Sequence, residues 1–534
     1  MNNKFEQGVF KNLRYDLPAS LVVFLVALPL CLGIAFGSSA PTFSGLIAGI
    51  VGGIIVASVS RSSLSVSGPA AGLITIVSGA ITEFGTDANG NVDLAAGFKV
   101  FILAVAIAGL IQILLGFAKA GLIGSFFPSS VIKGMLAAIG LILILKQVPH
   151  AFGYDADYEG DESFVDPSGQ TTFDQIINAF DNITEGAIII SSISLLILVL
   201  WERPFLKKRR FFSTVPAPLI VVLLGVGLNA LFASQFPSLA ISKEHMVAID
   251  VPDKFSEYGN LFLTPDFSYL GDWAIYKVAI TIAIVASLET LLSIDATDKL
   301  DPFKRITPLN RELKAQGMGN FISGMIGGLP ITAVIVRSSA NVNSGARSRS
   351  SAVIHGVLLL VTALLIPSTL NQIPLASLAA ILLTVGYKLT RPALYIDLFK
   401  KGWDQFLPFF ITVVAINLSD LLTGIGVGMV IGLLFVLRTN FHQAIFTVNK
   451  DGNYLIRLTK DVSFLNKALL RSTLQKLPEN SYVIIDGTKS QFIDKDIEET
   501  IEDFVQTAEF KNIKVEIKRT ALASNPLFQT KHKK

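Results

Sequence analysis

Two short apolar stretches, each interrupted by glycine and proline, limit the folds open to this chain. The first covers residues 65–80 around Gly68 and Pro69, and the second covers residues 327–341 around Pro330. A helix needs about 20 apolar residues to cross a bilayer, so neither stretch crosses one alone. Matched short segments of this kind in the two halves of a hydrophobic chain point to a central binding site between inverted repeats.

The composition is that of a membrane protein. Hydrophobic residues make up 51% of the 534 residues and charged residues only 16%, whereas soluble domains carry about 25% charged residues. The formal net charge of +3 is too small to indicate nucleic-acid binding. The single cysteine, Cys31, excludes a disulfide framework and a CxxC metal site.

Apolar runs long enough to span, or nearly so, fall into two similar halves. The first half has runs at about residues 18–36, 42–59, 97–118, 129–147, 185–201 and 214–233. The second half has runs at about residues 273–297, 311–327, 350–366, 374–387, 405–418 and 421–437. The interrupted stretch is third in each half, which makes about fourteen segments in two repeats of seven. An odd number per repeat requires the repeats to be inverted, and we expect a core domain and a gate domain.

The chain therefore divides into three predicted parts. Residues 1–16 form an N-terminal segment, and residues 17–438 form the α-helical transmembrane domain, with repeats at about 17–235 and 270–438. Residues 439–534 are more polar and form a small α/β domain. Its predicted elements are strands at 454–458, 481–485 and 513–517 and a helix at 496–508.

Charge placement predicts the orientation. Lys and Arg gather at residues 4–14, 203–210, 299–314, 347–349 and 388–401, all on one side by the span count. Short cytoplasmic loops are enriched in Lys and Arg, so both termini are predicted to lie in the cytoplasm and the protein in the cell membrane.

The loop at residues 151–181 falls on the opposite side and is strongly acidic. It holds eight Asp and Glu residues and no Lys or Arg. Asp155, Asp157 and Glu159 place a carboxylate at every second position, as calcium-binding loops do. Their spacing is not that of an EF-hand, however. A solvated, translocated loop is the favoured interpretation over a metal site.

The interrupted stretches predict an anion site. Proline is tolerated in the first turn of a helix, so Pro69 and Pro330 are each predicted to begin a helix inside the membrane. A glycine shortly before each proline allows the preceding backbone to be extended. Helix N-termini attract anions through unpaired N–H groups and the helix dipole. The candidate donors are the backbone N–H groups of Ala70, Ala71, Thr332 and Ala333 and the Thr332 hydroxyl. The alternative is that proline and glycine only kink two ordinary helices.

Glu289 and Ser293 are candidates for holding a coupling ion. Glu289 lies near the middle of the run 273–297, where an ionisable group costs roughly 2.5–3.5 kcal/mol on insertion scales. Ser293 is four residues further on and shares its helical face. Together they offer oxygen ligands to Na⁺, or Glu289 carries a proton. The alternative for Glu289 is a structural salt bridge to Arg337 or a neighbour.

Arg337 lies two turns into the second predicted half-helix. A guanidinium there raises the local potential and can bind an anion with two parallel hydrogen bonds. Its alternative is to extend toward the cytoplasmic surface and place its charge in water.

Several motifs in order along the chain resemble those of the SulP family of anion transporters. They are Asp16-Leu17-Pro18-Ala19-Ser20 with Leu28-Pro29, Ser65-Val66-Ser67-Gly68-Pro69, Ser287-Leu288-Glu289-Thr290-Leu291-Leu292-Ser293, Asn310-Arg311-Glu312-Leu313, Gln316-Gly317-Met318-Gly319-Asn320, Gly327-Gly328-Leu329-Pro330, Arg337, and Asn341-Val342-Asn343-Ser344-Gly345-Ala346-Arg347. The resemblance implies a secondary transporter and an arginine at position 337. In members similar to the BicA-type bicarbonate transporters, an acid and a hydroxyl matching Glu289 and Ser293 hold sodium.

The resemblance also shows two departures. Many family members have a glutamine after the Leu-Pro pair of the first span, where this chain has Leu30. The C-terminal domain is similar to the STAS module, but its helix start reads Asp494-Lys495-Asp496-Ile497 and lacks the usual serine. We expect this domain to be a dimerisation and folding module that exposes an interaction surface, not a nucleotide switch, and the protein to be a homodimer.

The expected function is uptake of a small inorganic anion, with bicarbonate and Na⁺ first and sulfate with H⁺ second. The candidate substrate site comprises Ser67, Gly68, Pro69, Ala70, Ala71, Pro330, Thr332, Ala333 and Arg337, and the candidate ion site Glu289 and Ser293. Dicarboxylate transport, an exchanger and an anion channel stay open. A nucleobase permease is disfavoured because 331–337 has no acid, and no catalytic or ATP-binding motif supports an enzyme or a cofactor.

Overall fold

The computed structural model of the chain describes residues 12–87, 91–156, 164–165, 170–207, 209, 211–212, 215–248, 255–443, 445–450, 452–458, 462–490 and 492–518. The chain divides into two compact units, the first ending at Met429 and the second beginning at Val430. Helix α20 (Leu421–Gln443) contains this division and also contains Arg438, where the sequence changes character. Most of the predicted N-terminal segment lies outside the described residues.

The first unit is almost entirely helical and repeats one order of elements. Its first half contains α1 (Leu13–Gly37), α2 (Thr42–Val51), a π-helical turn (Gly52–Val56), α3 (Ala57–Val59), β1 (Ser67–Pro69), the 3-10 turn η2 (Ala71–Leu73), α4 (Ile74–Gly85), α5 (Leu94–Phe117), η3 (Ala120–Phe126), α6 (Ser129–Phe152), α7 (Thr172–Asp181), α8 (Glu185–Trp201), α9 (Pro204–Lys207) and α11 (Ala217–Gln235). Its second half contains the 3-10 turns η4 (Pro237–Leu239), η5 (Lys243–His245), η6 (Phe255–Leu261) and η7 (Phe267–Gly271), then α12 (Trp273–Leu300), α13 (Leu309–Met325), β2 (Ile331–Ala333), α14 (Ile335–Asn343), α15 (Ser350–Leu365), α16 (Pro367–Leu370), α17 (Leu375–Leu389), α18 (Pro392–Lys400), α19 (Trp403–Leu418) and α20. A short strand followed by a short helix takes the predicted third place in each half.

Six helices within the described residues are long and apolar enough to cross a membrane. They are Leu13–Gly37, Thr42–Val59, Leu94–Phe117, Ser129–Phe152, Ala217–Gln235 and Trp273–Leu300. A seventh span would be α7 with α8, which are bent by 114°. The remaining apolar helices are shorter, so the helical membrane fold is confirmed while the count of fourteen segments stays a prediction.

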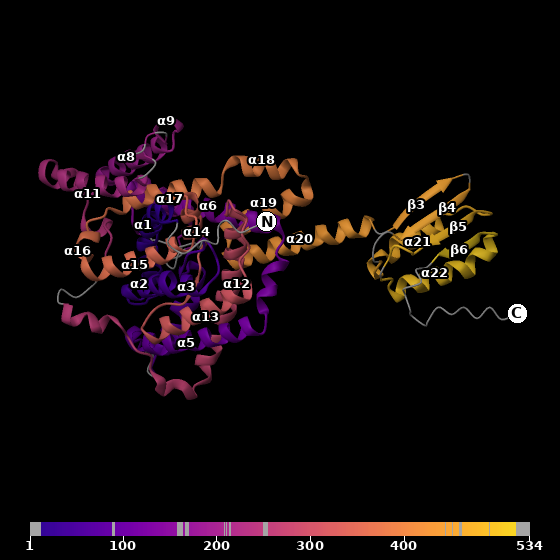
Figure 1. Ribbon diagram of the computed structural model, residues 1–534, viewed down its shortest axis with the longest axis horizontal. Coiled ribbons are helices and arrows are strands. Elements are labelled where there is room, and N and C mark those ends of the chain that lie inside the picture. The colour runs from indigo at the N-terminus through magenta and orange to yellow at the C-terminus, as the bar shows by residue number, and fades with distance from the viewer. Residues whose placement is uncertain are drawn as a thin grey trace. The chain divides into compact units, whose positions relative to one another are not determined.

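Two groups of helices make close contacts within the first unit. In the first group α5 lies beside α13 and also contacts α4 and α12, while α1 contacts α2, α14 and α15 (Figure 1). In the second group α6 packs against α17 and α19, and α8 packs against α11 and α17. Glycines permit the closest crossings: a Cβ on Gly109 of α5 would lie 2.5 Å from the carbonyl oxygen of Gly317 on α13. Small residues bring membrane helices this close where larger ones would separate them.

The two interrupted stretches meet as a two-stranded antiparallel sheet. Ser67 pairs with Ala333, Gly68 with Thr332 and Pro69 with Ile331. The prediction that Pro69 and Pro330 begin helices is wrong in detail, because the backbone around them is extended. The helices begin later, at Ala71 and at Ile335.

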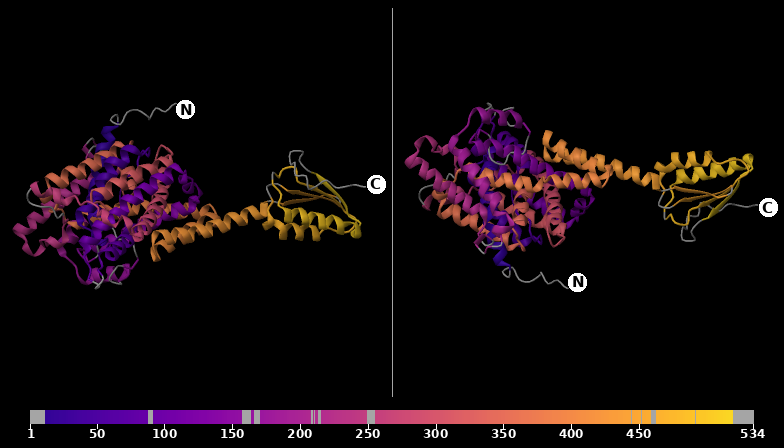
Figure 2. Two further views of the ribbon diagram at one scale, coloured as in Figure 1. Left: turned by 90° about the horizontal axis from the view of Figure 1, so that it is seen from below. Right: turned by 90° about the horizontal axis from the view of Figure 1, so that it is seen from above.

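The second unit is a small α/β domain. Its sheet has the order β3 (Ile445–Lys450), β4 (Asn453–Leu458), β5 (Tyr482–Asp486) and β6 (Lys514–Lys518). The first pair is antiparallel and the other two are parallel. Helices α21 (Lys467–Gln475) and α22 (Lys495–Ala508) contact each other and lie along one face of the sheet (Figure 2). The three predicted strands and the helix are confirmed, whereas β3 and α21 were not predicted.

Candidate functional site

Polar side chains of α13 hold the two extended stretches in place. Asn320 donates to the carbonyl oxygen of Ile331 at 3.0 Å and accepts from its N–H at 2.5 Å. Gln316 donates to the Ser67 hydroxyl at 2.8 Å, and Ser323 donates to the carbonyl oxygen of Leu329 at 2.7 Å. Unwound backbone at membrane depth needs such partners because no water is available there. The polar residues of α13 therefore explain how the broken stretches persist.

Arg337 is buried completely in the first turns of α14. Its Nη1 lies over Gly68, where an ideal Cβ would be 2.0 Å from this nitrogen. Within the described residues none of its three nitrogens has a hydrogen bond of normal geometry, and the thiol of Cys31, a weak acceptor, lies beside it. The side chain does not extend to the surface, which excludes the snorkelling alternative in this conformation.

Glu289 lies against the start of the other half-helix. An ideal Cβ on Gly72 would be 3.3 Å from its Oε2 and 3.6 Å from its Oε1. No ion pair joins Glu289 to Arg337 among the residues that the structure describes. Two glycines four residues apart, Gly68 and Gly72, thus make room for one cation and one carboxylate on the same short segment.

The hydroxyl groups near Glu289 have different environments. Ser293 is buried on the next turn of α12, as its spacing predicts. The hydroxyl oxygen of Thr290 accepts a hydrogen bond from the backbone N–H of Ala333 at 3.2 Å. The N–H of Ala333, which was predicted to bind the anion, therefore already has a partner inside the protein. Thr332 is fully buried, and its hydroxyl has no partner in the described part of the chain.

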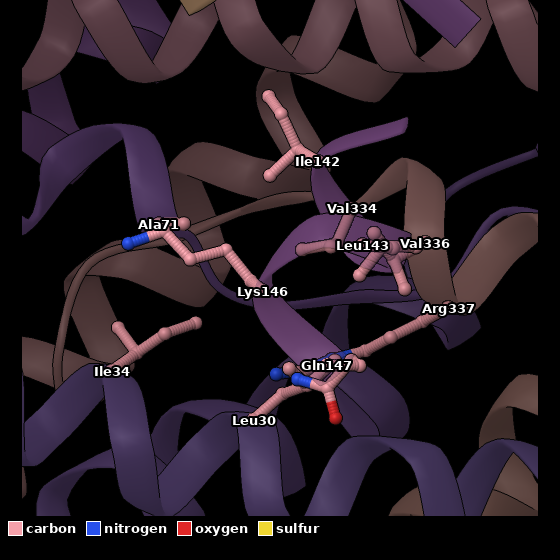
Figure 3. A pocket seen from close by; sticks show the side chains of 10 residues that line it. All are labelled: Leu30, Ile34, Ala71, Ile142, Leu143, Lys146, Gln147, Val334, Val336 and Arg337. Carbon is pink, nitrogen blue, oxygen red and sulfur yellow. The ribbon is translucent and has the colours of Figure 1, made fainter. Parts of the chain in front are cut away.

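A cavity, here called the central cavity, lies where the two half-helices begin. Its lining comprises Leu30, Ile34, Ala71, Ile142, Leu143, Lys146, Gln147, Val334, Val336 and Arg337. Figure 3 shows the Lys146 side chain extending toward Ala71, and Arg337 entering from the opposite side with Gln147 nearby. The N–H groups in the first turn of a helix have no partners within that helix, so free donors are expected near this space, although the N–H of Val334 is already bonded to the carbonyl oxygen of Val66 at 2.9 Å. Arg337 and Lys146 give the lining its cationic groups, and most of the other lining residues are apolar, which suits a small anion.

The central cavity contains only part of the predicted substrate site. Ala71 and Arg337 line it. The other seven predicted residues are buried and do not line it: Ser67, Gly68, Pro69, Ala70, Pro330, Thr332 and Ala333. They form the paired strands and the chain flanking them, so in this conformation they position the site without touching its cavity.

Sequence reasoning missed the contribution of α6. Lys146 and Gln147 line the central cavity from this helix, and both are buried. A charged residue at the end of the apolar run 129–147 is the same signal that drew attention to Glu289. Gly72 was also missed, since glycine in an apolar run has many roles.

Much of the acidic loop, including Asp157 and Glu159, lies outside the described residues. Asp155 is described and joins two histidines: its Oδ1 is 2.5 Å from Nδ1 of His150, and its Oδ2 is 2.5 Å from Nδ1 of His245. No group of three His, Cys, Asp or Glu side chains suited to a metal ion occurs among the described residues. The calcium interpretation gains no support from these positions.

Comparison with known proteins identifies the family. A family model described as the sulfate permease family matches residues 13–413, well over half of the chain. The chain belongs to the sulfate permease family. It is 27% identical to the putative sulfate transporter YvdB of Bacillus subtilis over 446 residues, which cover 82% of this chain and 76% of that protein. It is 25% identical to the bicarbonate transporter BicA of Picosynechococcus over 457 residues, which cover 84% and 75%.

Solved structures share the fold of this sulfate permease family member. The transmembrane domain of a cyanobacterial bicarbonate transporter BicA matches with a TM-score of 0.54 and 21% identity, over 79% of this chain and 98% of that chain. The murine anion transporter Slc26a9 in its inward-facing state matches with a TM-score of 0.66 and 18% identity, over 96% and 87%. Together with the family match, these findings make the chain a membrane anion transporter and not an enzyme.

Proposed function

We propose that this sulfate permease family member is a secondary active transporter that takes up bicarbonate together with Na⁺. The buried guanidinium of Arg337 carries this proposal, because its nitrogens have no hydrogen-bond partner among the described residues and it lines a cavity. A buried charge without a partner costs several kcal/mol, and an anion in the cavity would compensate it.

The chemistry of the cavity favours a small anion. Leu30 and Ile34 contribute apolar surface where a larger anion would need side-chain donors. Donors are instead concentrated at Arg337, Lys146 and the first turns of the two half-helices. The relative BicA, named as a bicarbonate transporter, is similar over most of this chain.

Glu289 and Ser293 are proposed to hold the coupling Na⁺. A carboxylate and a hydroxyl one helical turn apart supply oxygen ligands, which Na⁺ requires. Because Glu289 lies against Gly72, a cation bound there would reinforce the positive potential at the start of α4. Anion and Na⁺ would then bind more tightly together than alone, which is the thermodynamic basis of symport.

Sulfate uptake with H⁺ is the second candidate. The name of the relative YvdB favours it, and a carboxylate such as Glu289 can carry a proton as well as bind Na⁺. The protein would act as a homodimer in the cell membrane with both termini in the cytoplasm.

Uptake into proteoliposomes tests these proposals. Labelled bicarbonate and labelled sulfate are each supplied with an inward Na⁺ gradient, an inward H⁺ gradient, or neither. We expect bicarbonate to accumulate above its external concentration only with Na⁺. Accumulation of sulfate with H⁺ would select the second candidate. Equilibration without accumulation under every gradient would contradict coupled transport and indicate a channel.

A further inference from the structure

Lys146 lies at a boundary between two cavities. It occupies the last turns of α6, is only 7% exposed, and donates from Nζ to Oε1 of Gln175 on α7 at 3.3 Å. One of these cavities is the central cavity, which Lys146 shares with Ala71 and Arg337. A buried lysine in a membrane bundle is costly, which indicates a role in the passage of ions.

The second cavity, here called the outer cavity, lies on the other side of Lys146. Its lining comprises Leu141, Ile142, Leu145, Lys146, Phe164, Thr172, Phe173, Asn417 and Leu418. Ile142 and Lys146 line both cavities, so one stretch of α6 separates them. Lys146 is therefore the one charged side chain, among the described residues, that borders both spaces.

Helix α7 forms one wall of the outer cavity. A capping box between Thr171 and Asp174 begins this helix, and a bend of 114° separates it from α8. Thr172 faces the cavity and is bonded to the carbonyl oxygen of Phe164, while Ile177 on the same helix is exposed. Because α7 is the last part of the acidic loop at residues 151–181, the outer cavity belongs to the side that is predicted to be extracytoplasmic.

We propose that Lys146 is a second anion-binding residue and that the outer cavity is the route by which the anion reaches the central cavity from the acidic-loop side. This inference rests on the proposed anion transport. In the conformation described here, the ammonium group is bonded to a neutral amide, Gln175. Exchanging this neutral acceptor for an anion replaces a bond in which only the donor is charged by an ion pair in which both groups are charged. Lys146 thus exchanges Gln175 for the anion and passes it toward Arg337.

Two substitutions separate anion binding from a structural tether. Lys146→Met keeps the length of the apolar stem and removes the charge, while Gln175→Met removes the amide partner alone. For labelled bicarbonate and sulfate uptake by the full chain, we expect Lys146→Met to raise KM by at least about tenfold, as for loss of one charge-assisted hydrogen bond. Lys146→Arg should restore most of the affinity, and Gln175→Met should not raise KM. Equal increases in KM for Lys146→Met and Gln175→Met would overturn the proposal in favour of a tether.

Accessibility of the outer cavity supplies a test that does not depend on how well Lys146→Met folds. Thr172→Cys faces the cavity, and Ile177→Cys on the same helix is its matched control. The parent protein controls for Cys31, which is buried. A negatively charged methanethiosulfonate reagent added outside whole cells should block uptake at position 172, more slowly when bicarbonate or sulfate is present. At position 177 it should react without blocking uptake.

The two kinds of failure are distinguishable. If the parent protein accumulates neither bicarbonate nor sulfate, the proposed function fails. If the parent transports normally, but modification at position 172 leaves uptake unchanged and Lys146→Met keeps the parent KM, the role of Lys146 and the outer cavity is wrong while anion transport stands.

Discussion

Nη1 of Arg337 lies 2.0 Å from the position that a Cβ on Gly68 would occupy. The guanidinium therefore lies directly on the backbone of β1, and only glycine permits this approach. The same segment meets Glu289 at Gly72. The first interrupted stretch thus positions charges that belong to the second half of the chain, which couples the two repeats at the site.

Replacing Gly68 with alanine should displace Arg337 and weaken transport. Overpacking a tight site costs about 1–3 kcal/mol of folding stability, and a guanidinium displaced from the site should in addition raise KM for the anion. The matched control is Gly79→Ala in α4, where a Cβ meets nothing within 4 Å. Anion uptake as a function of concentration measures the effect, and a Gly68→Ala protein with the parent KM would contradict the placement of Arg337.

Thr332→Val should affect anion binding and the stability of the folded protein in different directions. The buried Thr332 hydroxyl has no partner among the described residues, so replacing it with a methyl group should leave the thermal unfolding midpoint unchanged or raise it. If the hydroxyl binds the anion during the transport cycle, KM rises by several-fold at the same time. A stabilised protein with unchanged KM would remove Thr332 from the substrate site.

Glu289→Gln should abolish the dependence of uptake on the coupling ion. The amide keeps the size of the side chain and its contact with Gly72 but loses the charge that binds Na⁺ or carries H⁺. Asp295→Asn, on the same helix and paired with Lys299 in a partly exposed position, is the control. The test is to measure anion uptake with and without Na⁺ or H⁺ gradients. If these gradients stimulate uptake by the Glu289→Gln protein as much as by the parent protein, Glu289 does not take part in ion coupling.

The contacts around Asp155 should make stability depend on pH. Burial raises the pKa of Asp155, but hydrogen bonds from His150 and His245 outweigh it and hold that pKa below its usual value. The hydrogen bond to Asp155 raises the pKa of His245, assisted by the charges of Asp155 and Glu244 and opposed by partial burial and the charge of His150.

The pKa of His245 is higher in the folded state than in the unfolded state, where it is about 6.5. The contribution of His245 to stability is therefore present in full below about pH 6.5 and is lost as the pH rises through the folded-state pKa. The thermal unfolding midpoint should fall as the pH rises above about 6.5 and through the raised pKa of His245, and His245→Gln, which cannot titrate, should reduce that fall. Identical pH profiles for the two proteins would show that this contact does not contribute.

Ending the chain after Arg438 should reduce dimer yield and transport more than it changes selectivity. The removed α/β unit has its own core, formed by residues such as Ile456, Leu470 and Ile485, whereas the central cavity is lined by residues of the first unit. Light scattering of the purified protein measures the oligomer. A truncated protein that is fully dimeric would argue against dimerisation through this unit.

The helical membrane fold followed from the sequence because its causes are local. Hydrophobic run length determines whether a segment can cross a bilayer, and the interrupted stretches around Pro69 and Pro330 were recognisable by their length. The strands β4, β5 and β6 and the helix α22 were predictable for the same reason, since their apolar periodicity is contained in a few residues. By contrast β3 is exposed over most of its length, so no buried face gives its residues an apolar alternation that would predict a strand.

The arrangement of the site depended on contacts between residues far apart in sequence. Proline predicts a helix start, yet at Pro69 an antiparallel partner 262 positions away at Ile331 makes the backbone extended. The same pairing moves the half-helix starts to Ala71 and Ile335. Lys146 was overlooked because the cavity that it lines with Arg337 exists only in the folded protein, where residues of α1, α6 and α14 come together.

The sequence by itself determined that this is a membrane transporter with two matched broken segments. It also singled out Arg337 and Glu289 as candidate site residues, because burying a charge in a bilayer is costly wherever it occurs. Only the tertiary structure decided which groups share one cavity. The arrangement of the site depends on how closely side chains approach the backbone of distant segments, as Arg337 approaches Gly68 and Glu289 approaches Gly72. Such distances cannot be predicted from the pattern of residues along a single chain segment.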